Sequence, residues 1–247
     1  MKVFLSALEA SPEFEKIDKE ILKYKNNLMS FYYIKNKIER AIRIRNKSEL
    51  VLIDSGAHSF QKGKKVDWDK YTEQYAEFIK NFDKPNVIGY FEMDVDNIIG
   101  YDKVLELRKA LEKVSNKIIP VWHKNRGIEE YKKMCQDYTG KIIAITGFKN
   151  EDIKDEQYLM FLKYAKKYNC KVHCLGMTRK KVLDKVPFDY VDSSSWKQQS
   201  IYGMIGRKKV AKEFSKQKRW KVMLENYKKA MQMQDYYYKK WRKVCKD

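Results

Sequence analysis

Residues 87–122, VIGYFEMDVDNIIGYDKVLELRKALEKVSNKIIPVW, carry the pattern that decides the fold. Two apolar, β-branched runs, Val87–Met93 and Lys117–Trp122, have the length and composition of buried strands. Between them, Tyr101–Ser115 repeats its apolar residues at the spacing of an amphipathic helix. A strand, a helix and a second strand in this order predict two parallel strands joined by a right-handed crossover.

The same alternation continues in both directions along the chain. Strands are expected at Val3–Ala7, Leu28–Ile34, Leu50–Ile53, Val87–Met93, Lys117–Trp122, Lys141–Ile145, Lys171–Leu175 and Tyr190–Asp192. Helices are expected at Glu13–Tyr24, Lys35–Arg45, Trp68–Asn81, Tyr101–Ser115, Ile128–Tyr138, Glu156–Tyr168 and Thr178–Lys185. Eight such units in about 200 residues fit an α/β fold of the closed (β/α)8 type, a TIM barrel. An open doubly wound sheet is the alternative, but it would need a glycine-rich loop after the first strand, and SALEASPEF (residues 6–14) has no glycine.

The C-terminal segment 207–247 differs from the rest in composition. It holds 15 Lys or Arg and 4 Asp or Glu, with aromatic residues between them. We therefore divide the chain into a catalytic barrel, residues 1–206, and a basic helical extension packed on it, residues 207–247. A basic face with interleaved aromatic residues can bind phosphates and stack on bases. The alternative is that the segment is the last helix of the barrel, with its lysines in solvent. The candidate nucleic-acid contacts are Arg207, Lys208, Lys209, Lys239, Lys240, Arg242 and Lys243.

The charge of the whole chain points to the same class of partner. The 247 residues include 53 Lys or Arg and 33 Asp or Glu, which gives a net charge of +20. This excess predicts a polyanionic partner, nucleic acid first and an anionic membrane surface second. A lysine-rich composition that follows from AT-rich coding is the alternative origin of the charge. The 43% hydrophobic content excludes wholesale disorder, and no run of about 18 apolar residues is present for a membrane span.

The cysteines and the N-terminus bear on the compartment. Cys170 and Cys174 enclose His173, but no second Cys/His pair completes a tetrahedral metal site. So few cysteines in a chain of this size predict reduced thiols in a cytoplasm. The opening MKVFLSALEASPEFEK lacks the apolar length of a secretory signal. We therefore expect a cytoplasmic protein without a membrane partner.

Acidic residues follow three of the predicted strands. They are Asp54, Asp94 and Asp192, and the carboxyl ends of barrel strands form one mouth where reactive groups collect. Each has a structural explanation on its own. Asp54 precedes Ser55-Gly56 and could form a turn, and Asp192 precedes three serines and could cap a helix. Their coincidence at one mouth favours a shared functional role.

The fourth predicted strand ends in an acidic cluster. Glu92, Asp94 and Asp96 alternate, so a period of two places them on one face. Three acids buried without partners would be costly, which favours Asp94, and Asp96 after it, at the solvent-filled mouth. His173 lies inside a predicted strand and is expected to be a core histidine rather than a ligand.

These strand ends predict a reaction type. One carboxylate could attack an electrophilic carbon while another moves a proton, and the same pair could serve glycoside chemistry through an oxocarbenium-like transition state. Gly56, Gly147 and Gly176 would allow a planar ligand to approach the backbone closely. With the basic surface, the residues predict a barrel enzyme that acts on a sugar–base or sugar–phosphate polymer. Spacing and charge alone lead no further.

Six segments at these strand ends resemble, in matching order, motifs of the tRNA-guanine transglycosylase superfamily. They are LIDSGAHSFQ (52–61), YFEMDVD (90–96), IIPVWHKN (118–125), IAITGF (143–148), HCLGMT (173–178) and VPFDYVDSSSW (186–196). In that family an aspartate attacks C1′ of a guanosine, displaces guanine and holds the sugar covalently until a 7-deazaguanine replaces it. The resemblance implies Asp192 as the nucleophile, with Asp189 as a weaker candidate.

The resemblance also implies roles for neighbouring residues. Asp54 would be the general acid/base, and Asp94 would read the N1–H and amino group of guanine. His58, or Phe60 beside it, would stack on the base. His123 stands, after Trp122, where the family has Gln-Gly. The remaining substrate-binding candidates are Ser55, Gly56, Thr146, Gly147, Gly176 and Trp196, of which Trp196 would stack on a base or fill the space that a flipped base leaves.

Departures from the family pattern narrow the expected substrate. Ala57 replaces the second glycine of the Gly-Gly turn, and the Cys-x-Cys-x-x-Cys…His zinc module is absent. The chain is thus closer to the compact phage-type branch that inserts 7-deazaguanine derivatives, preQ0-like bases, into DNA, which would place it in a host-cell cytoplasm. The expected partners are DNA and the free 7-deazaguanine base, with no metal and no cofactor.

Other functions remain as alternatives to a DNA-guanine transglycosylase. The same chemistry on tRNA, of the queuosine or archaeosine type, is the first. A glycosylase that removes a base and lets water complete the reaction is the second. A nucleic-acid-binding barrel without turnover is the alternative outside enzymes. The family often dimerises, but the sequence contains no interface signal.

Overall fold

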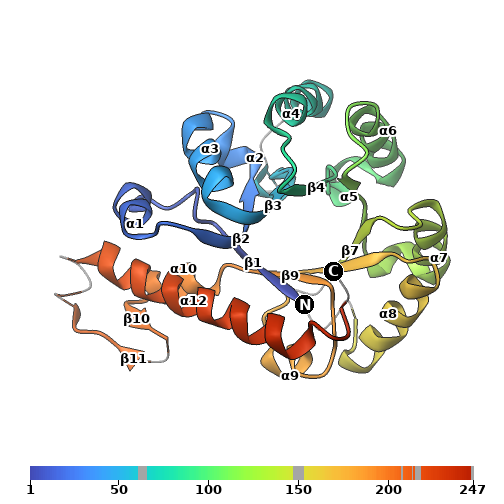
Figure 1. Cartoon of the computed structure of the whole chain (residues 1–247). Helices are drawn as coiled ribbons and strands as arrows, with labels where there is room; N and C mark the ends of the chain where they lie inside the picture. Colours follow the sequence, from blue (N-terminus) through green and yellow to red (C-terminus); the bar gives the residue numbers. More distant parts are fainter. Residues whose placement is uncertain (61–65, 147–152, 207, 213, 215–217, 246–247) are drawn as a thin grey trace.

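The strands of the main sheet are all parallel. The computed structural model describes residues 1–60, 66–146, 153–206, 208–212, 214 and 218–245. The sheet runs in the order β5-β4-β3-β2-β1-β9-β8-β7-β6 (Figure 1). Its segments are β1 (Lys2–Ser6), β2 (Tyr24–Ser30), β3 (Ser48–Asp54), β4 (Val87–Phe91), β5 (Ile118–Ile119), β6 (Val121–Trp122), β7 (Ile142–Thr146), β8 (Lys171–Leu175) and β9 (Tyr190–Ser193).

The two end segments of this order are halves of one strand, which closes the sheet. β5 pairs with β4 and β6 pairs with β7, and only Pro120 separates β5 from β6. Proline has no N–H to donate to a ladder, but its carbonyl accepts a hydrogen bond from the Ala144 amide at 2.9 Å. The nine segments therefore form an eight-stranded parallel barrel, and the predicted TIM-barrel fold is confirmed.

Helices surround the barrel between successive strands (Figure 1). The described helices are α1 (Phe14–Glu20), α2 (Phe31–Ile34), α3 (Ile38–Lys47), α4 (Trp68–Phe82), α5 (Asp96–Ile99), α6 (Tyr101–Glu112), α7 (Gly127–Asp137), α8 (Tyr158–Lys167), α9 (Lys180–Leu183), α10 (Ser195–Ile201) and α12 (Arg219–Trp241). Short 3-10 turns lie at η1 (Ala57–Phe60), η2 (Lys124–Arg126) and η3 (Asp155–Gln157). A small antiparallel hairpin joins β10 (Met204–Ile205) to β11 (Lys208–Lys209).

The second strand lies four residues earlier than the apolar pattern predicts. The run Phe31–Ile34 forms α2 rather than the end of a strand, and a short apolar run fits either structure on periodicity alone. The strand instead includes Asn26 and Asn27, whose amide groups are both hydrogen-bonded in the interior. Partners from distant segments satisfy these polar groups, and such partners cannot be read from the local pattern.

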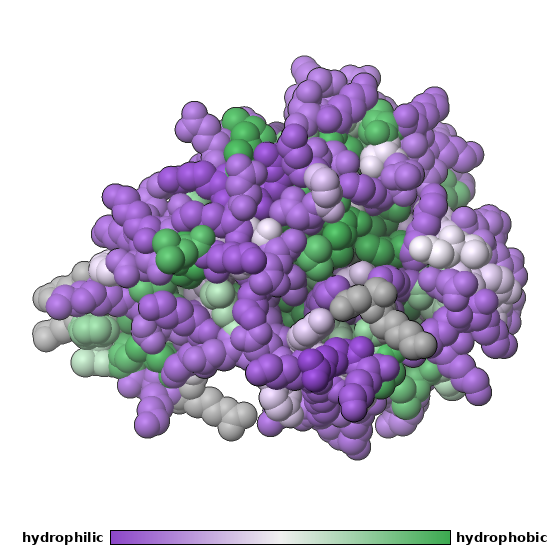
Figure 2. All heavy atoms as spheres, in the orientation of Figure 1, coloured by the Kyte–Doolittle hydropathy of each residue, from purple (hydrophilic) through white to green (hydrophobic). Residues whose placement is uncertain are grey.

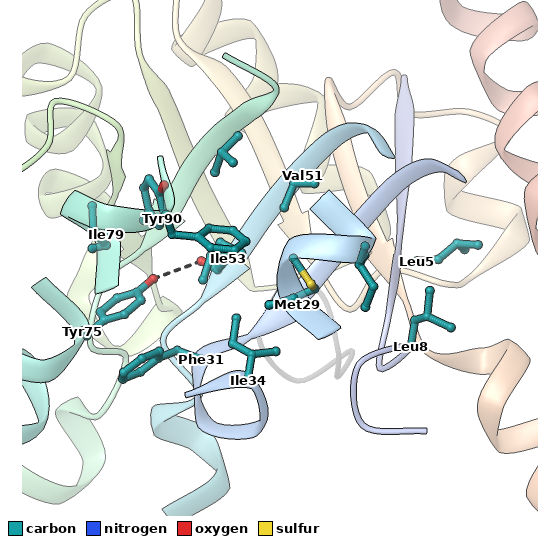
Figure 3. Packing of buried hydrophobic residues seen from close by; sticks show 14 of the residues in the cluster. Leu5, Leu8, Met29, Phe31, Ile34, Val51, Ile53, Tyr75, Ile79 and Tyr90 are labelled. Atoms are coloured by element: carbon teal, nitrogen blue, oxygen red, sulfur yellow. Dashed lines mark hydrogen bonds between the residues drawn. The ribbon is translucent and has the colours of Figure 1, made fainter. Parts of the chain in front are cut away.

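Alternate residues of the strands point to opposite sides of the sheet and contribute to three buried clusters. One set points into the barrel and forms its own cluster, and the other set points outward to the helices. In Figure 3, Met29 and Ile53 of the strands pack beside Ile34 and Tyr75 of the helices, and the Tyr75 hydroxyl donates to the Ile53 carbonyl at 3.2 Å. The inward cluster consists of Phe4, Leu28, Leu52, Phe91, Ile119, Val121, Ala144 and Tyr190.

The long helix α12 packs along β1, β2 and α10. Its buried face bonds to the barrel through polar side chains: Gln234 donates to the Val3 carbonyl at 2.7 Å, and the Tyr227 hydroxyl donates to Asn27 at 2.7 Å. Most of its lysines are exposed, and the face of the molecule in Figure 2 is largely hydrophilic. Within the described part of the chain, no helix has both the length and the low polarity that a membrane crossing requires.

Candidate active site at the carboxyl ends of the strands

Period-two alternation places polar side chains above the apolar interior of the barrel. Leu52 and Tyr190 belong to the inward cluster, and the residues two positions further along the same strands are Asp54 and Asp192. Side chains two apart on a strand share a face. The carboxyl ends of β3 and β9 therefore direct carboxylates toward the barrel axis. Ser6, Ser30, His123 and Thr146 follow other inward residues by the same rule.

Asp192 is held through one carboxylate oxygen. Its Oδ1 lies 3.0 Å from His173 Nε2 and accepts the Gly176 amide at 2.8 Å. Gly176 has a φ of 62°, a left-handed conformation that favours glycine at this turn. The side chain remains 15% exposed, so Asp192 is both anchored and open to the mouth.

Asp54 carries the clearest sign that the acids converge. Burial raises its pKa from 3.8 to about 7, with the charge of Asp94 as the next cause and that of Asp192 as a smaller one, while the Gly56 amide opposes the rise. These interactions show that Asp54 of β3, Asp192 of β9 and Asp94, which follows β4, lie within electrostatic reach of one another. A pKa near 7 lets a carboxyl group give and take a proton at neutral pH.

Gly56 is required for the turn that follows Asp54. Its φ is 74°, and a Cβ at this position would lie 2.4 Å from Cβ of Tyr32. Any larger residue would therefore push the η1 segment away from α2. Sequence reasoning assigned Gly56 to close approach of a ligand, whereas in the structure it permits close approach of another part of the chain.

The acidic cluster after β4 divides into a structural part and a mouth part. The strand ends at Phe91, and Glu92 is fully buried. Glu92 forms an ion pair with Arg108 of α6 and accepts the Val121 amide. The prediction that the three acids share one face is thus wrong for Glu92, because the regular strand stops before it.

Asp94 and Asp96 each pair with a cation from the next unit of the barrel. Asp94 Oδ1 lies 2.6 Å from His123 Nε2, and Asp96 lies 2.9 Å from Arg126. Burial would lower the pKa of His123, but the hydrogen bond and charge of Asp94 outweigh it and the pKa is raised. The contact with Asp94 therefore stabilises the protonated form of His123.

Asp94, Asp96 and His123 are the candidate metal ligands among the described residues. Asp94, Asp96 and His123 each offer one ligand atom, and these atoms lie within 4.8 Å of one another. A cation there would have to break the Asp94–His123 contact and lie beside the positive guanidinium of Arg126. The donor set is therefore a poor fit for a divalent metal.

Glu9 is a further mouth residue that sequence reasoning missed. It follows β1 and is only 2% exposed, and its Oε1 accepts the Ser30 amide at 3.1 Å. Burial raises its pKa to about 7, while the Ser30 amide and the charge of Lys197 oppose the rise and that of Asp54 adds to it. The available signal was an acid beyond a strand end, in SALEASPEF (residues 6–14).

The alternative nucleophile lies at the other end of the barrel. Asp189 precedes β9, and its Oδ2 accepts the Val172 amide at 2.8 Å at the start of β8. Its backbone carbonyl accepts the Lys2 amide at the start of β1. Asp189 is therefore at the amino ends of the strands, away from Asp54 and Asp94.

Trp196 does not stand where a base could stack on it. Its side chain is 3% exposed and packs edge-on against Tyr227 of α12, with ring centroids 5.0 Å apart. Its indole N–H donates to the Ser6 carbonyl at 2.9 Å. The expectation of base stacking is corrected, because α10 turns this side chain outward into the layer between β1 and α12.

The other predicted substrate-binding residues have different environments. Ser55 is fully buried, and its carbonyl accepts the Tyr71 hydroxyl at 2.8 Å. Thr146 ends β7, and its buried Oγ1 has no hydrogen-bond partner among the residues that the structure describes. Gly147 lies outside the described residues, as does the side chain of His58 in η1.

The predicted nucleic-acid contacts fall into two groups. Lys208 and Lys209 are exposed on β11, and Arg207 lies outside the described residues. The second group, at the end of α12, comprises the exposed Lys239, Arg242 and Lys243, together with Lys240, which pairs with Asp184 at 2.8 Å.

The second group lies at the end of the barrel opposite the mouth. Trp241 donates to the Leu183 carbonyl, and the Cys245 thiol contacts the Phe188 carbonyl, both just before β9 begins. At its other end, α12 places Met223 against Ser11, beyond the carboxyl end of β1. A helix of 23 residues spans about 34 Å at 1.5 Å per residue. The final lysines of α12 therefore lie away from the mouth, and their contact with nucleic acid stays a prediction.

Comparison with known proteins reveals similarity only at the level of fold. The sequence matches no family model and no curated protein. Among solved structures, it is similar to a crystal structure named for a fructose-1,6-biphosphate aldolase from Coccidioides immitis, with a TM-score of 0.56 and 11% identity, covering 96% of this chain and 90% of that chain. At this identity the likeness shows the barrel fold alone.

Proposed function

We propose that the protein is a guanine transglycosylase that exchanges guanine in DNA for a 7-deazaguanine base. The observation that carries the proposal is a pair of carboxyl groups in one mouth with different environments. Two hydrogen-bond donors fix one oxygen of Asp192 in place, whereas burial raises the pKa of Asp54 to about 7. Carboxyl groups whose environments differ in this way divide into a nucleophile and a proton carrier.

In the first half of the reaction, Asp192 attacks the sugar. Its carboxylate oxygen forms a bond to C1′ while the C1′–N9 bond breaks and the electron pair leaves with guanine. Asp54, initially protonated, donates its proton to the departing base. The negative charge thus moves from Asp192 to Asp54, and guanine leaves neutral.

The electrostatic coupling of the two acids assists this step. The charge of Asp192 contributes to the raised pKa of Asp54. When Asp192 becomes a neutral ester, that contribution disappears and the pKa of Asp54 falls. Asp54 therefore becomes the stronger acid at the moment when the leaving base needs a proton.

In the second half, the incoming 7-deazaguanine reverses these transfers. Its N9–H proton passes to the Asp54 carboxylate, N9 bonds to C1′, and the bond from C1′ to Asp192 breaks to regenerate the carboxylate. Two inversions at C1′ retain the configuration of the nucleoside. No water enters the balance, so exclusion of water distinguishes exchange from hydrolysis.

Asp94 and His123 are suited to recognise the base. Asp94 uses Oδ1 for His123, which leaves its second oxygen to accept hydrogen bonds from the N1–H and amino group of guanine. Asp94 stabilises the protonated form of His123, and in that form His123 balances the charge of Asp94. Both bases in the exchange share this edge, so one recognition device serves both half-reactions.

The net charge of +20 supports a polyanionic substrate. We favour DNA because the sequence lacks the zinc module of the tRNA-acting relatives that it resembles. Of the predicted nucleic-acid contacts in the described chain, Lys208 and Lys209 are exposed in the β10–β11 hairpin. This hairpin lies near the end of α12 that is closer to the mouth.

The test is to incubate the protein with radiolabelled preQ0 base and either duplex DNA or tRNA. Label in DNA would support the proposal, and label in tRNA alone would replace it with the tRNA alternative. Released guanine without incorporation would indicate a glycosylase, and binding without either product would indicate a binding protein. Asp137→Asn, at an exposed residue of α7, serves as the matched control for active-site aspartate variants.

A further inference from the structure

The ring of His173 is enclosed in the apolar interior of the barrel. It is fully buried, and its centroid lies 5.1 Å from that of Phe91, 6.3 Å from Phe4 and 6.5 Å from Tyr190. These three rings pack around the imidazole. The hydrogen-bond partner of the ring among the described residues is Asp192, at Nε2.

The two ring nitrogens have different surroundings. Nε2 lies 3.0 Å from Asp192 Oδ1, whereas Nδ1 is buried with no hydrogen-bond partner in the described structure. A carboxylate oxygen needs a donor at this distance. The proton of a neutral ring must therefore be on Nε2, because an N–H at Nδ1 would leave both groups unsatisfied.

Asp192 consequently has two unlike oxygens. Oδ1 accepts both the His173 Nε2–H and the Gly176 amide, at 3.0 and 2.8 Å. Among the described residues, Oδ2 accepts no such hydrogen bond, and it belongs to a side chain that is 15% exposed. One oxygen is thus committed to the protein and the other is open to the mouth.

We propose that His173 is a positioning residue that selects Oδ2 of Asp192 as the attacking atom. This role rests on the proposed exchange reaction. Oδ2 forms the bond to C1′, and Oδ1 becomes the ester carbonyl, which keeps both donors. When the ester bond breaks in the second half, the electron pair returns to the carboxylate, and the same two donors stabilise its charge.

The proton of His173 stays on Nε2 throughout this cycle. Asp54 supplies and recovers the only transferred proton, so His173 acts neither as acid nor as base. The apolar ring cage holds the imidazole in one orientation, which fixes the rotation of the Asp192 carboxylate. The sequence resemblance assigns no role to His173, and the isolated strand pattern predicts only a core residue.

The first experiment tests the geometry independently of activity. Nitrogen-15 NMR of histidine-labelled full-length protein, assigned with His173→Gln, is expected to show the Nε2–H tautomer. Asp192→Asn is expected to shift the Nε2–H proton resonance, because an amide replaces the carboxylate. An Nδ1–H tautomer, or no response to Asp192→Asn, would overturn the proposal whether or not the protein exchanges bases.

The second experiment tests the consequence for catalysis. His173→Phe retains a ring without a donor, and removal of one such donor is expected to lower kcat about 10²-fold without changing the Kd for DNA. His173→Gln, which keeps an N–H donor, is expected to recover at least part of that loss. Phe91→Leu reduces the packing around the ring without removing a hydrogen bond and controls for loss of packing.

The outcomes of the two experiments separate this role from the proposed function. Full kcat in folded His173→Phe, or equal losses in His173→Phe and His173→Gln, would overturn the positioning role. If His173→Phe does not fold, full kcat in a folded His173→Leu variant, which also has no donor at this position, would do the same. Absence of exchange by the wild-type protein, with the tautomer observed, would refute the exchange reaction and leave the hydrogen-bond geometry intact.

Discussion

The two ends of the barrel carry opposite kinds of charge and show different degrees of organisation. At the carboxyl end, Asp54 and Asp192 come from separate strands and interact with each other and with fixed donors. At the amino end, the lysines that finish α12 are exposed, and Lys240 pairs with Asp184 of the same surface. A charge-rich segment does not by itself determine where its charges lie on the fold, whereas acids at several strand ends of a parallel barrel are brought to the same end of the barrel.

The largest difference is expected between two variants that each lose one acid, one at the carboxyl end and one at the amino end of the barrel. Asp192→Asn should lower exchange on the order of 10³-fold or more, because the covalent route needs the carboxylate. Incorporation of labelled base and trapping of a covalent protein–DNA adduct measure the effect. Asp189→Asn, at the amino end, keeps an acceptor for the Val172 amide and should retain exchange. Equal losses in the two variants would remove the distinction between the ends.

The proton carrier should produce the next largest effect. Asp54→Asn should lower exchange by about 10²-fold or more, as expected for loss of general acid–base catalysis. In the wild type, guanine displacement requires protonated Asp54, so kcat/KM for this half-reaction should fall as pH rises through the pKa of about 7. In Asp54→Asn, this fall of kcat/KM with rising pH should be absent. A pH profile that Asp54→Asn leaves unchanged would assign the proton transfer to another group.

Glu9 tests whether a buried acid at the mouth lowers the free energy of unfolding. Its folded pKa of about 7 exceeds the ordinary 4.5, so as pH rises from 4.5 to 7 the unfolded chain releases a proton that the folded chain retains. The stabilising contribution of that proton is complete below pH 4.5 and is lost above pH 7. Glu9→Gln cannot ionise and should stabilise the protein at pH 8 by roughly 2–3 kcal/mol.

The change in stability caused by Glu9→Gln should depend on pH and should exceed that of the same substitution at an exposed glutamate. At pH 4 the stabilisation by Glu9→Gln should nearly vanish, because the wild-type carboxyl group is then protonated in both states. Glu20→Gln at an exposed position should change little at either pH. Urea unfolding at both pH values measures these differences. A destabilised Glu9→Gln at pH 8 would show that the charged carboxylate contributes to stability.

The smallest effect should come from the basic surface. Lys208→Glu with Lys209→Glu, on the hairpin, should weaken DNA binding about tenfold and reduce the slope of log K against log salt by about 2. Lys239→Glu with Lys243→Glu, at the amino end, should have a smaller effect, since α12 carries these residues away from the mouth. Fluorescence anisotropy over a salt series measures both. A larger loss at the amino end would place the DNA path there.

Local pattern was sufficient for the fold and for part of the site. Alternating strands and helices predicted the barrel, and a period of two carried Asp54 and Asp192 from the strand ends into the mouth. It could not predict Glu9, because burial of that side chain depends on the neighbouring strand, whose Ser30 amide holds it. Nor could it separate Glu92 from Asp94, because the distinction depends on where β4 ends and on Arg108 of α6.

Chain order and side-chain periodicity, which are local properties, were enough to specify a parallel barrel with acids at its carboxyl end. Three features required contacts between residues far apart in the chain. They are closure through the strand split at Pro120, the direction of α12 and the inward environment of His173. Periodicity assigns a residue to a face of its own strand or helix. Its partners depend on the register and packing of other elements, which is why the position of Asp192 was predictable and its hydrogen bond to His173 was not.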